Sequence, residues 1–157
     1  MIARWLIINL SIIIFIILWS FIQGYASNII LFGKILAQVA FALFLVNLNM
    51  YFFFLFIRKS KVRKIKTQLA KMSKHMMKYH IPIAITATCL IMLHSTIMLL
   101  AQDLILKAAS GILAVFLLSI LLFTGFFRRR KATGLRRKLH YRMAFLFFTV
   151  VLVHIFI

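Results

Sequence analysis

Four of the five histidines form two pairs with the same spacing: His80 and His94 are fourteen residues apart, as are His140 and His154. In an α-helix, this spacing places two imidazoles about 21 Å apart along the axis and within about 40° of the same face. One such pair is too widely separated to hold a single ion. Two such helices side by side offer two stacked sites, each with one imidazole from each helix. This is the arrangement of axial ligands for two haems.

The composition is that of an integral membrane protein. The 157 residues are 65% hydrophobic, the mean hydropathy is +1.08, and there is one acidic residue. In a soluble domain roughly a quarter of the residues would be charged. The length has room for about five spans of around 20 apolar residues. A soluble flavin or nucleotide domain would therefore have to belong to another chain.

The positive charge is concentrated between the apolar runs. Seventeen of the twenty lysines and arginines lie in two blocks, Arg58 to Lys78 and Arg128 to Arg142, within a formal net charge of +19. A protein that binds nucleic acid needs its basic residues on a water-soluble face. Because the basic residues here lie between apolar runs, we expect no nucleic-acid partner. The positive-inside rule instead assigns both blocks to cytoplasmic loops in contact with anionic lipid. The pattern predicts a multi-pass protein of a plasma membrane of bacterial type.

Hydropathy and charge predict an all-α bundle of five transmembrane helices with the N-terminus cytoplasmic and the C-terminus outside. The first run, at the N-terminus, is longer than the apolar part of a signal peptide, so we interpret it as an uncleaved span. The predicted spans are Trp5–Ile22, Ile35–Ile57, Tyr79–Ala101, Leu104–Phe127 and His140–Ile157. The spans and the basic blocks divide the chain into three predicted segments. These are a helical hairpin (1–57), a basic amphipathic cytoplasmic segment (58–78) and a three-span haem-binding bundle (79–157).

Several residues predict local features of these spans. Asn47 and Asn49 are amides within a span, so they should face other helices, as packing contacts or beside a cofactor or quinone. Pro82 suits the first turn of its helix. Gly111 and Gly125 allow a close approach of backbone or cofactor.

Two further features lie outside the spans. Residues Gln23 to Gly33 carry Gly, Ser and Asn and no long apolar run, which predicts a short outer turn. His75 belongs to the basic segment and to neither histidine pair, so it is interpreted as a surface residue.

The charged loops make the third and fifth spans parallel, which places His80 level with His140, and His94 level with His154. Histidines within a span are costly and usually serve a cofactor, an ion path or a proton relay. Two neutral imidazoles fill both axial positions of a haem iron, which favours electron transfer over oxygen binding. Hydrogen-bonded packing histidines and non-haem metal sites are the alternatives.

Basic residues near the two levels can pair with haem propionates or act as interfacial cations whose ends reach the headgroups. The candidates are Lys78, Arg136 and Arg142 at the inner level and Lys34 and Lys107 at the outer level.

The basic segment 135–142 leading into His140, with the two histidine pairs, resembles the ferric reductase-like and NADPH oxidase-like transmembrane cytochromes b, and more loosely the quinol-oxidising cytochromes b. The resemblance covers residues 78–157. It implies two haem b groups, the inner one held by His80 and His140 and the outer one by His94 and His154. Electrons would pass from a cytoplasmic flavin or a quinol toward an outer acceptor. The chain would then be the electron-transfer subunit of an oxidoreductase, with a flavoprotein or quinone-linked partner subunit.

Two alternatives remain. The chain can be a quinol-linked haem anchor, for which Asp103 and Gln102 are the candidate quinone residues on the outer turn. It can also be a haem-free structural or assembly subunit of a membrane complex.

Overall fold

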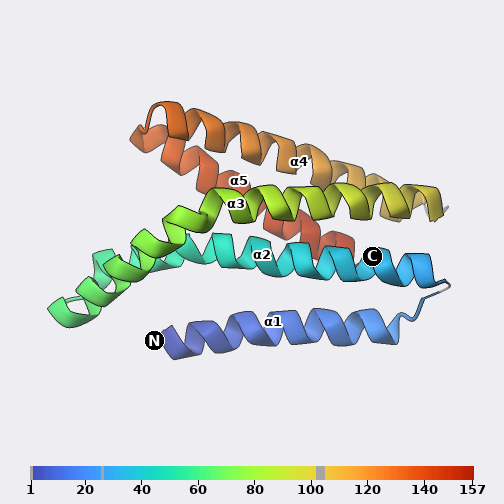
Figure 1. Ribbon diagram of the computed structural model, residues 1–157, viewed down its shortest axis with the longest axis horizontal. Coiled ribbons are helices and arrows are strands. Elements are labelled where there is room, and N and C mark those ends of the chain that lie inside the picture. The colour runs from blue at the N-terminus through green and yellow to red at the C-terminus, as the bar shows by residue number, and fades with distance from the viewer. Residues whose placement is uncertain (1, 26, 102–104) are drawn as a thin grey trace. The chain divides into compact units, whose positions relative to one another are not determined.

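The computed structural model describes residues 2–25, 27–101 and 105–157, and the side chains of residues 7–25, 27–101 and 106–157. These residues form five α-helices and no strand (Figure 1), which confirms the all-α prediction. The helices are α1 (Ile2–Ile22), α2 (Asn28–Lys59), α3 (Arg63–Ala101), α4 (Ile105–Arg130) and α5 (Gly134–Phe156).

Four helices, α2 to α5, are long and apolar enough to cross a membrane. The described apolar part of α1, Ile7–Ile22, is shorter. Many large apolar side chains are exposed on the helices, with Leu100 at 85% and Ile22 at 78% of their full accessible surface. Such exposure suits lipid and not water, so the chain is a multi-pass membrane protein.

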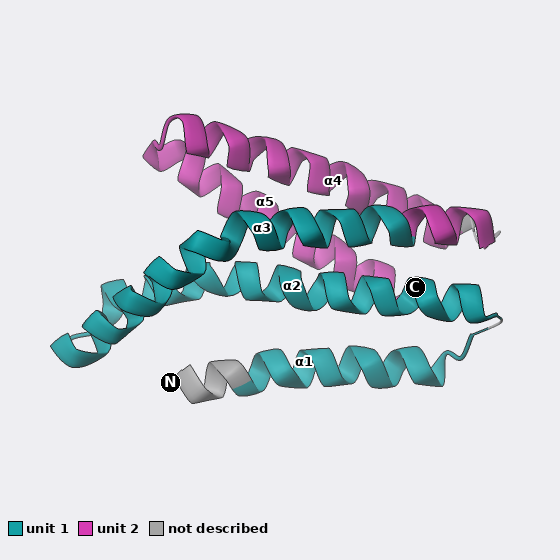
Figure 2. Ribbon diagram, in the orientation of Figure 1, with its two compact units in different colours: residues 1–94 teal, residues 95–157 magenta. Residues whose placement is uncertain are grey.

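The chain divides into two compact units (Figure 2), unit 1 with residues Met1–His94 and unit 2 with residues Ser95–Ile157. In unit 1, α1 packs against α2. In unit 2, α4 and α5 pack along one another as an antiparallel hairpin. The three segments predicted from charge and hydropathy remain predictions.

The predicted outer turn between the first two spans is shorter than expected. Helix α2 begins at Asn28, because the Ser27 side chain caps it by accepting a hydrogen bond from the Ile30 N–H at 3.3 Å. Gly24 takes a positive φ of 66°, and its carbonyl accepts a hydrogen bond from Lys34 Nζ. The prediction that the turn extends to Gly33 is therefore wrong.

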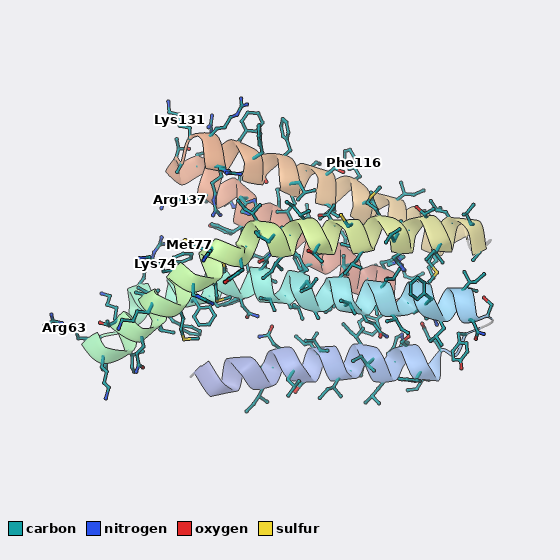
Figure 3. All side chains as sticks on the ribbon, viewed as in Figure 1. Arg63, Lys74, Met77, Phe116, Lys131 and Arg137 are labelled. Carbon is teal, nitrogen blue, oxygen red and sulfur yellow. The ribbon has the colours of Figure 1, made fainter. Side chains whose placement is uncertain are left out.

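Helix α3 continues through the basic segment that was predicted to be separate from the span. It runs without a break from Arg63 to Ala101 and changes direction along its length in Figure 1. Pro82 lies inside this helix, so the prediction that Pro82 occupies a first turn is wrong. Lysine is a good helix former, and the boundary of the hydrocarbon does not itself end a helix. Figure 3 shows Arg63 and Lys74 on this basic part of α3.

Helix α5 begins six residues before His140. Thr133 caps it by accepting a hydrogen bond from the Arg136 N–H at 3.3 Å. The Arg136 guanidinium donates to the carbonyl oxygens of Phe127 and Lys131, at 3.1 and 3.2 Å, which closes the turn from α4. Figure 3 shows Lys131 at this end of unit 2.

Candidate functional site

His154 on α5 packs against the part of α4 that contains Ser110. The His154 Nδ1 atom lies 2.8 Å from Ser110 Oγ. The single hydroxyl proton of Ser110 is donated to the Lys107 carbonyl oxygen at 3.0 Å. Ser110 Oγ is therefore the acceptor and His154 Nδ1 is the donor. In a neutral imidazole, a proton on Nδ1 places the lone pair on Nε2.

His140 has an equivalent partner near the other end of the same hairpin. The Thr124 hydroxyl donates its proton to the Leu121 carbonyl oxygen at 2.8 Å. The His140 Nδ1 atom lies 3.3 Å from Thr124 Oγ1, so Nδ1 donates to this oxygen in a longer contact. Thr124 is buried, with 7% of its surface exposed. The same tautomer follows for His140, with the lone pair on Nε2.

Two glycines of α4 make room for these two rings. A Cβ atom at Gly111 would lie 3.3 Å from Cε1 of His154, and one at Gly125 would lie 3.2 Å from Cε1 of His140. Both distances are shorter than an ordinary van der Waals contact, so each imidazole lies directly on the backbone of α4. Each glycine directly follows the hydroxyl residue that accepts from the same ring. The α4 helix thus holds each histidine by one hydrogen bond and one close contact.

In unit 1, His94 on α3 is held by the backbone of α2. Its Nδ1 atom lies 2.9 Å from the Gly33 carbonyl oxygen. A carbonyl oxygen can only accept, so His94 Nδ1 carries the proton and Nε2 carries the lone pair. Hence His94 has the tautomer that we assign to His140 and His154.

His80 is connected to α2 through its backbone. Asn47 Nδ2 donates a hydrogen bond to the His80 carbonyl oxygen at 3.1 Å. Asn49 exchanges hydrogen bonds with Asn9 of α1, with 3.2 Å for each of the two amide contacts. Both asparagines therefore face other helices, which confirms this prediction from the sequence.

The fourteen-residue spacing of the histidines recurs on the helices that hold them. Gly33 and Asn47, the partners of α3, are fourteen residues apart on α2. Gly111 and Gly125, the partners of α5, are fourteen residues apart on α4. Because each partner helix runs antiparallel to its histidine helix, equal spacings bring both contacts of a hairpin into register. Each hairpin presents its histidine pair at two levels of one helix.

The ring hydrogen bonds at His94, His140 and His154 have a chemical consequence. Metal-ligating histidines usually donate the second ring N–H to a carbonyl, hydroxyl or carboxylate, which fixes the tautomer and the ring orientation. The partners described above are of this kind. This arrangement suits an imidazole that binds iron through Nε2.

The fifth histidine differs from these four. His75 is exposed on the basic part of α3, and its ring contacts the ring of Tyr79 edge-on at a centroid distance of 5.0 Å. It remains interpreted as a surface residue.

The basic residues considered as propionate partners have different surroundings. Lys78 and Arg142 are exposed, and Lys107 is half-buried. Arg136 and Lys34 donate to backbone carbonyl oxygens in the turns described above. These contacts give Arg136 and Lys34 a structural role in those turns.

The quinone candidates Gln102 and Asp103 lie outside the described residues. Within the described residues, no three histidine, cysteine or acidic side chains come together as a metal-binding group. A structural zinc site would need such a cluster, whereas axial ligation of a haem needs only two imidazoles.

The hydroxyl partners Ser110 and Thr124 are not among the residues predicted from the sequence. Small hydroxyl residues are common in apolar spans as packing residues, so neither stands out by type. Their signal is the repeated pair of hydroxyl residue and glycine, Ser110 before Gly111 and Thr124 before Gly125, at the spacing of the histidines.

The chain matches no protein-family model, no curated protein and no solved structure. The likeness to transmembrane cytochromes b therefore rests on the histidine pairs and the basic segment 135–142. The functional interpretation depends on the geometry of the histidines within each hairpin.

Proposed function

We propose that the chain is a membrane cytochrome b, which binds two haem b groups and conducts electrons across the membrane. The single observation that carries this proposal is the common orientation of the rings. Nδ1 of His94, His140 and His154 donates to a backbone or hydroxyl oxygen, which leaves the Nε2 lone pair as the ligand atom.

The residues present fit haem in two respects. Neutral imidazole nitrogen is the ligand that haem iron takes in many b-type cytochromes. The glycine contacts at Gly111 and Gly125 keep the Cε1 atoms of the two rings of α5 against α4, which fixes the position of each ring. Both features position nitrogen ligands before any cofactor binds, which reduces the cost of binding.

The pairing of ligands comes from the sequence. Equal spacing and the direction of the spans pair His80 with His140 and His94 with His154. The basic segments 58–78 and 128–142 assign the first pair to the cytoplasmic side, with the N-terminus cytoplasmic and the C-terminus outside. Lys78 and Arg142 are the exposed cations available for carboxylates at the inner level.

A bound haem b supplies a reversible one-electron change at its iron. With two histidines for each haem, the chain would leave no place for oxygen to bind, and it would keep both haems within a hydrocarbon core of about 30 Å. The donor is a flavoprotein or quinone-linked partner subunit, and the acceptor lies on the outer side. The membrane is a bacterial plasma membrane.

Haem content of the purified protein tests this proposal. The parent, His94→Ala, His154→Ala and the control His75→Ala are purified in detergent, and pyridine haemochrome is quantified per chain with oxidised and reduced spectra. We expect two haems in the parent and in His75→Ala, whose ring is exposed on the same helix as His94. Each of the other variants should lose at least one haem. A folded parent without haem would contradict the proposal and leave a structural or assembly subunit.

A further inference from the structure

We propose that Ser110 and Thr124 are positioning residues that lower the reduction potentials of the two haems, with the larger effect from Ser110. This inference rests on the proposed function, because it concerns the ligands His154 and His140. The two hydroxyl groups would act through hydrogen bonds to the histidine rings and would not bind the iron themselves.

Each hydroxyl is the middle member of a directed chain of hydrogen bonds. In one chain, His154 Nδ1 donates to Ser110 Oγ, which donates to the Lys107 carbonyl oxygen. In the other, His140 Nδ1 donates to Thr124 Oγ1, which donates to the Leu121 carbonyl oxygen. Because the hydroxyl proton is already engaged, the oxygen lone pair faces the ring and stabilises positive charge on the imidazole.

The two series of hydrogen bonds have the same arrangement. Ser110 and Thr124 are fourteen residues apart, as are the two histidines, and each donates to the carbonyl three residues earlier. Other hydroxyl residues of this hairpin bond differently: Ser119 and Thr149 donate to the carbonyl four residues earlier and are exposed. Close packing alone would require the glycines but not a hydroxyl at the same place beside each ring.

A hydrogen bond from Nδ1–H to an oxygen increases the electron donation of the imidazole through Nε2. Stronger donation favours the oxidised iron and lowers the reduction potential. The contact at Ser110 is 2.8 Å and that at Thr124 is 3.3 Å, which is beyond the usual range for N–H···O bonds. The hydroxyl effect should therefore be larger at the level of His154 than at the level of His140.

Potentiometric titration of the haem-loaded protein tests this inference. The variants are Ser110→Ala, Thr124→Val, which keeps the shape of threonine, and Ser119→Ala as the matched control on the exposed face of α4. Ser110→Ala should raise the potential of one haem by about 59 mV, equivalent to a tenfold change in a one-electron equilibrium. Thr124→Val should raise the other by less, and Ser119→Ala should leave both unchanged.

A variant that keeps the hydroxyl group provides a second test, measured by the haem potentials, the haem content and the spectrum. Ser110→Thr keeps an oxygen at this position and should keep the parent potentials and the parent low-spin spectrum. Loss of haem in Ser110→Ala but not in Ser110→Thr would also support the positioning role. Loss in both variants would show that only packing matters and would overturn the inference.

Two results separate this inference from the proposed function. A parent with two haems whose potentials are the same in Ser110→Ala overturns the inference alone, as does an equal shift in Ser119→Ala. A folded parent without haem overturns both.

Discussion

The hairpins α2–α3 and α4–α5 both hold histidines fourteen residues apart, but they do so with different atoms. In α2–α3 the partners are a backbone carbonyl, of Gly33, and the amide of Asn47, which binds the backbone of His80. In α4–α5 the partners of the rings are two side-chain hydroxyls, each next to a glycine. A backbone carbonyl moves only with its helix, whereas a hydroxyl changes with one substitution. The α4–α5 hairpin is thus the one in which a single substitution can most easily change the hydrogen bonds of the histidine rings.

Filling the glycine contacts of α4 should give the largest effect. In Gly111→Leu and Gly125→Leu the new side chain would occupy the space of His154 or His140, since even a Cβ atom would lie 3.3 or 3.2 Å from the ring. We expect each variant to lose the haem at that level and to lose about 1–3 kcal/mol of stability through overpacking. Haem per chain and thermal unfolding in detergent measure the two effects.

Gly134→Ala is the matched control for these variants, because nothing lies within 4 Å of a Cβ atom at Gly134. Alanine is the better helix former, so this change should be neutral or stabilise by up to about 1 kcal/mol. Full haem content in Gly111→Leu and Gly125→Leu would mean that α5 can move away from α4, and the difference between the hairpins would disappear.

The amide contacts of unit 1 should give an intermediate effect. Asn9→Leu and Asn49→Leu each remove one member of a reciprocal pair, and the remaining amide loses this partner within a part-buried contact. We expect about 1–2 kcal/mol of destabilisation for each. Unfolding by SDS in mixed micelles, with far-UV circular dichroism as the signal, gives these free energies.

The double variant Asn9→Leu with Asn49→Leu is the internal control. It removes both polar groups together, so its cost should be smaller than the sum of the two single costs. Additive costs would show that the two amides do not act as a pair.

The helical class, the position of each histidine pair on a single helix and the helix-facing asparagines could be predicted, because each depends on residue type and spacing along one helix. The unbroken length of α3 could not. The basic segment 58–78 predicts an amphipathic helix on the membrane surface, separate from the span that begins at Tyr79. Instead, one helix runs from Arg63 through the span, because lysine and arginine continue a helix readily. The start of α2 was missed for a similar reason, since Ser27 belongs to a polar stretch and yet caps a helix.

The hydroxyl partners of the rings required knowledge of which residues of α4 face α5. Ser110 and Thr124 are separated from their histidines by 44 and 16 residues, so no local pattern joins them. The direction of each hydrogen bond also depends on where the hydroxyl proton goes, which only the positions of Lys107 and Leu121 reveal. Spacing predicts where the histidines lie along each helix, whereas the tautomers of their rings follow only from three-dimensional contacts.

Each unit has a helix capped by a side-chain hydroxyl, and removing these caps should change stability least. Ser27 caps α2 and Thr133 caps α5, each through a side-chain oxygen 3.3 Å from a backbone nitrogen. Replacement by alanine should cost up to about 1 kcal/mol at either cap. The loss should be smaller for Thr133→Ala, because Arg136 also holds that turn through two carbonyl oxygens. The same SDS unfolding experiment measures both variants. A larger loss at Thr133 than at Ser27 would mean that the arginine contacts depend on the cap and do not act beside it.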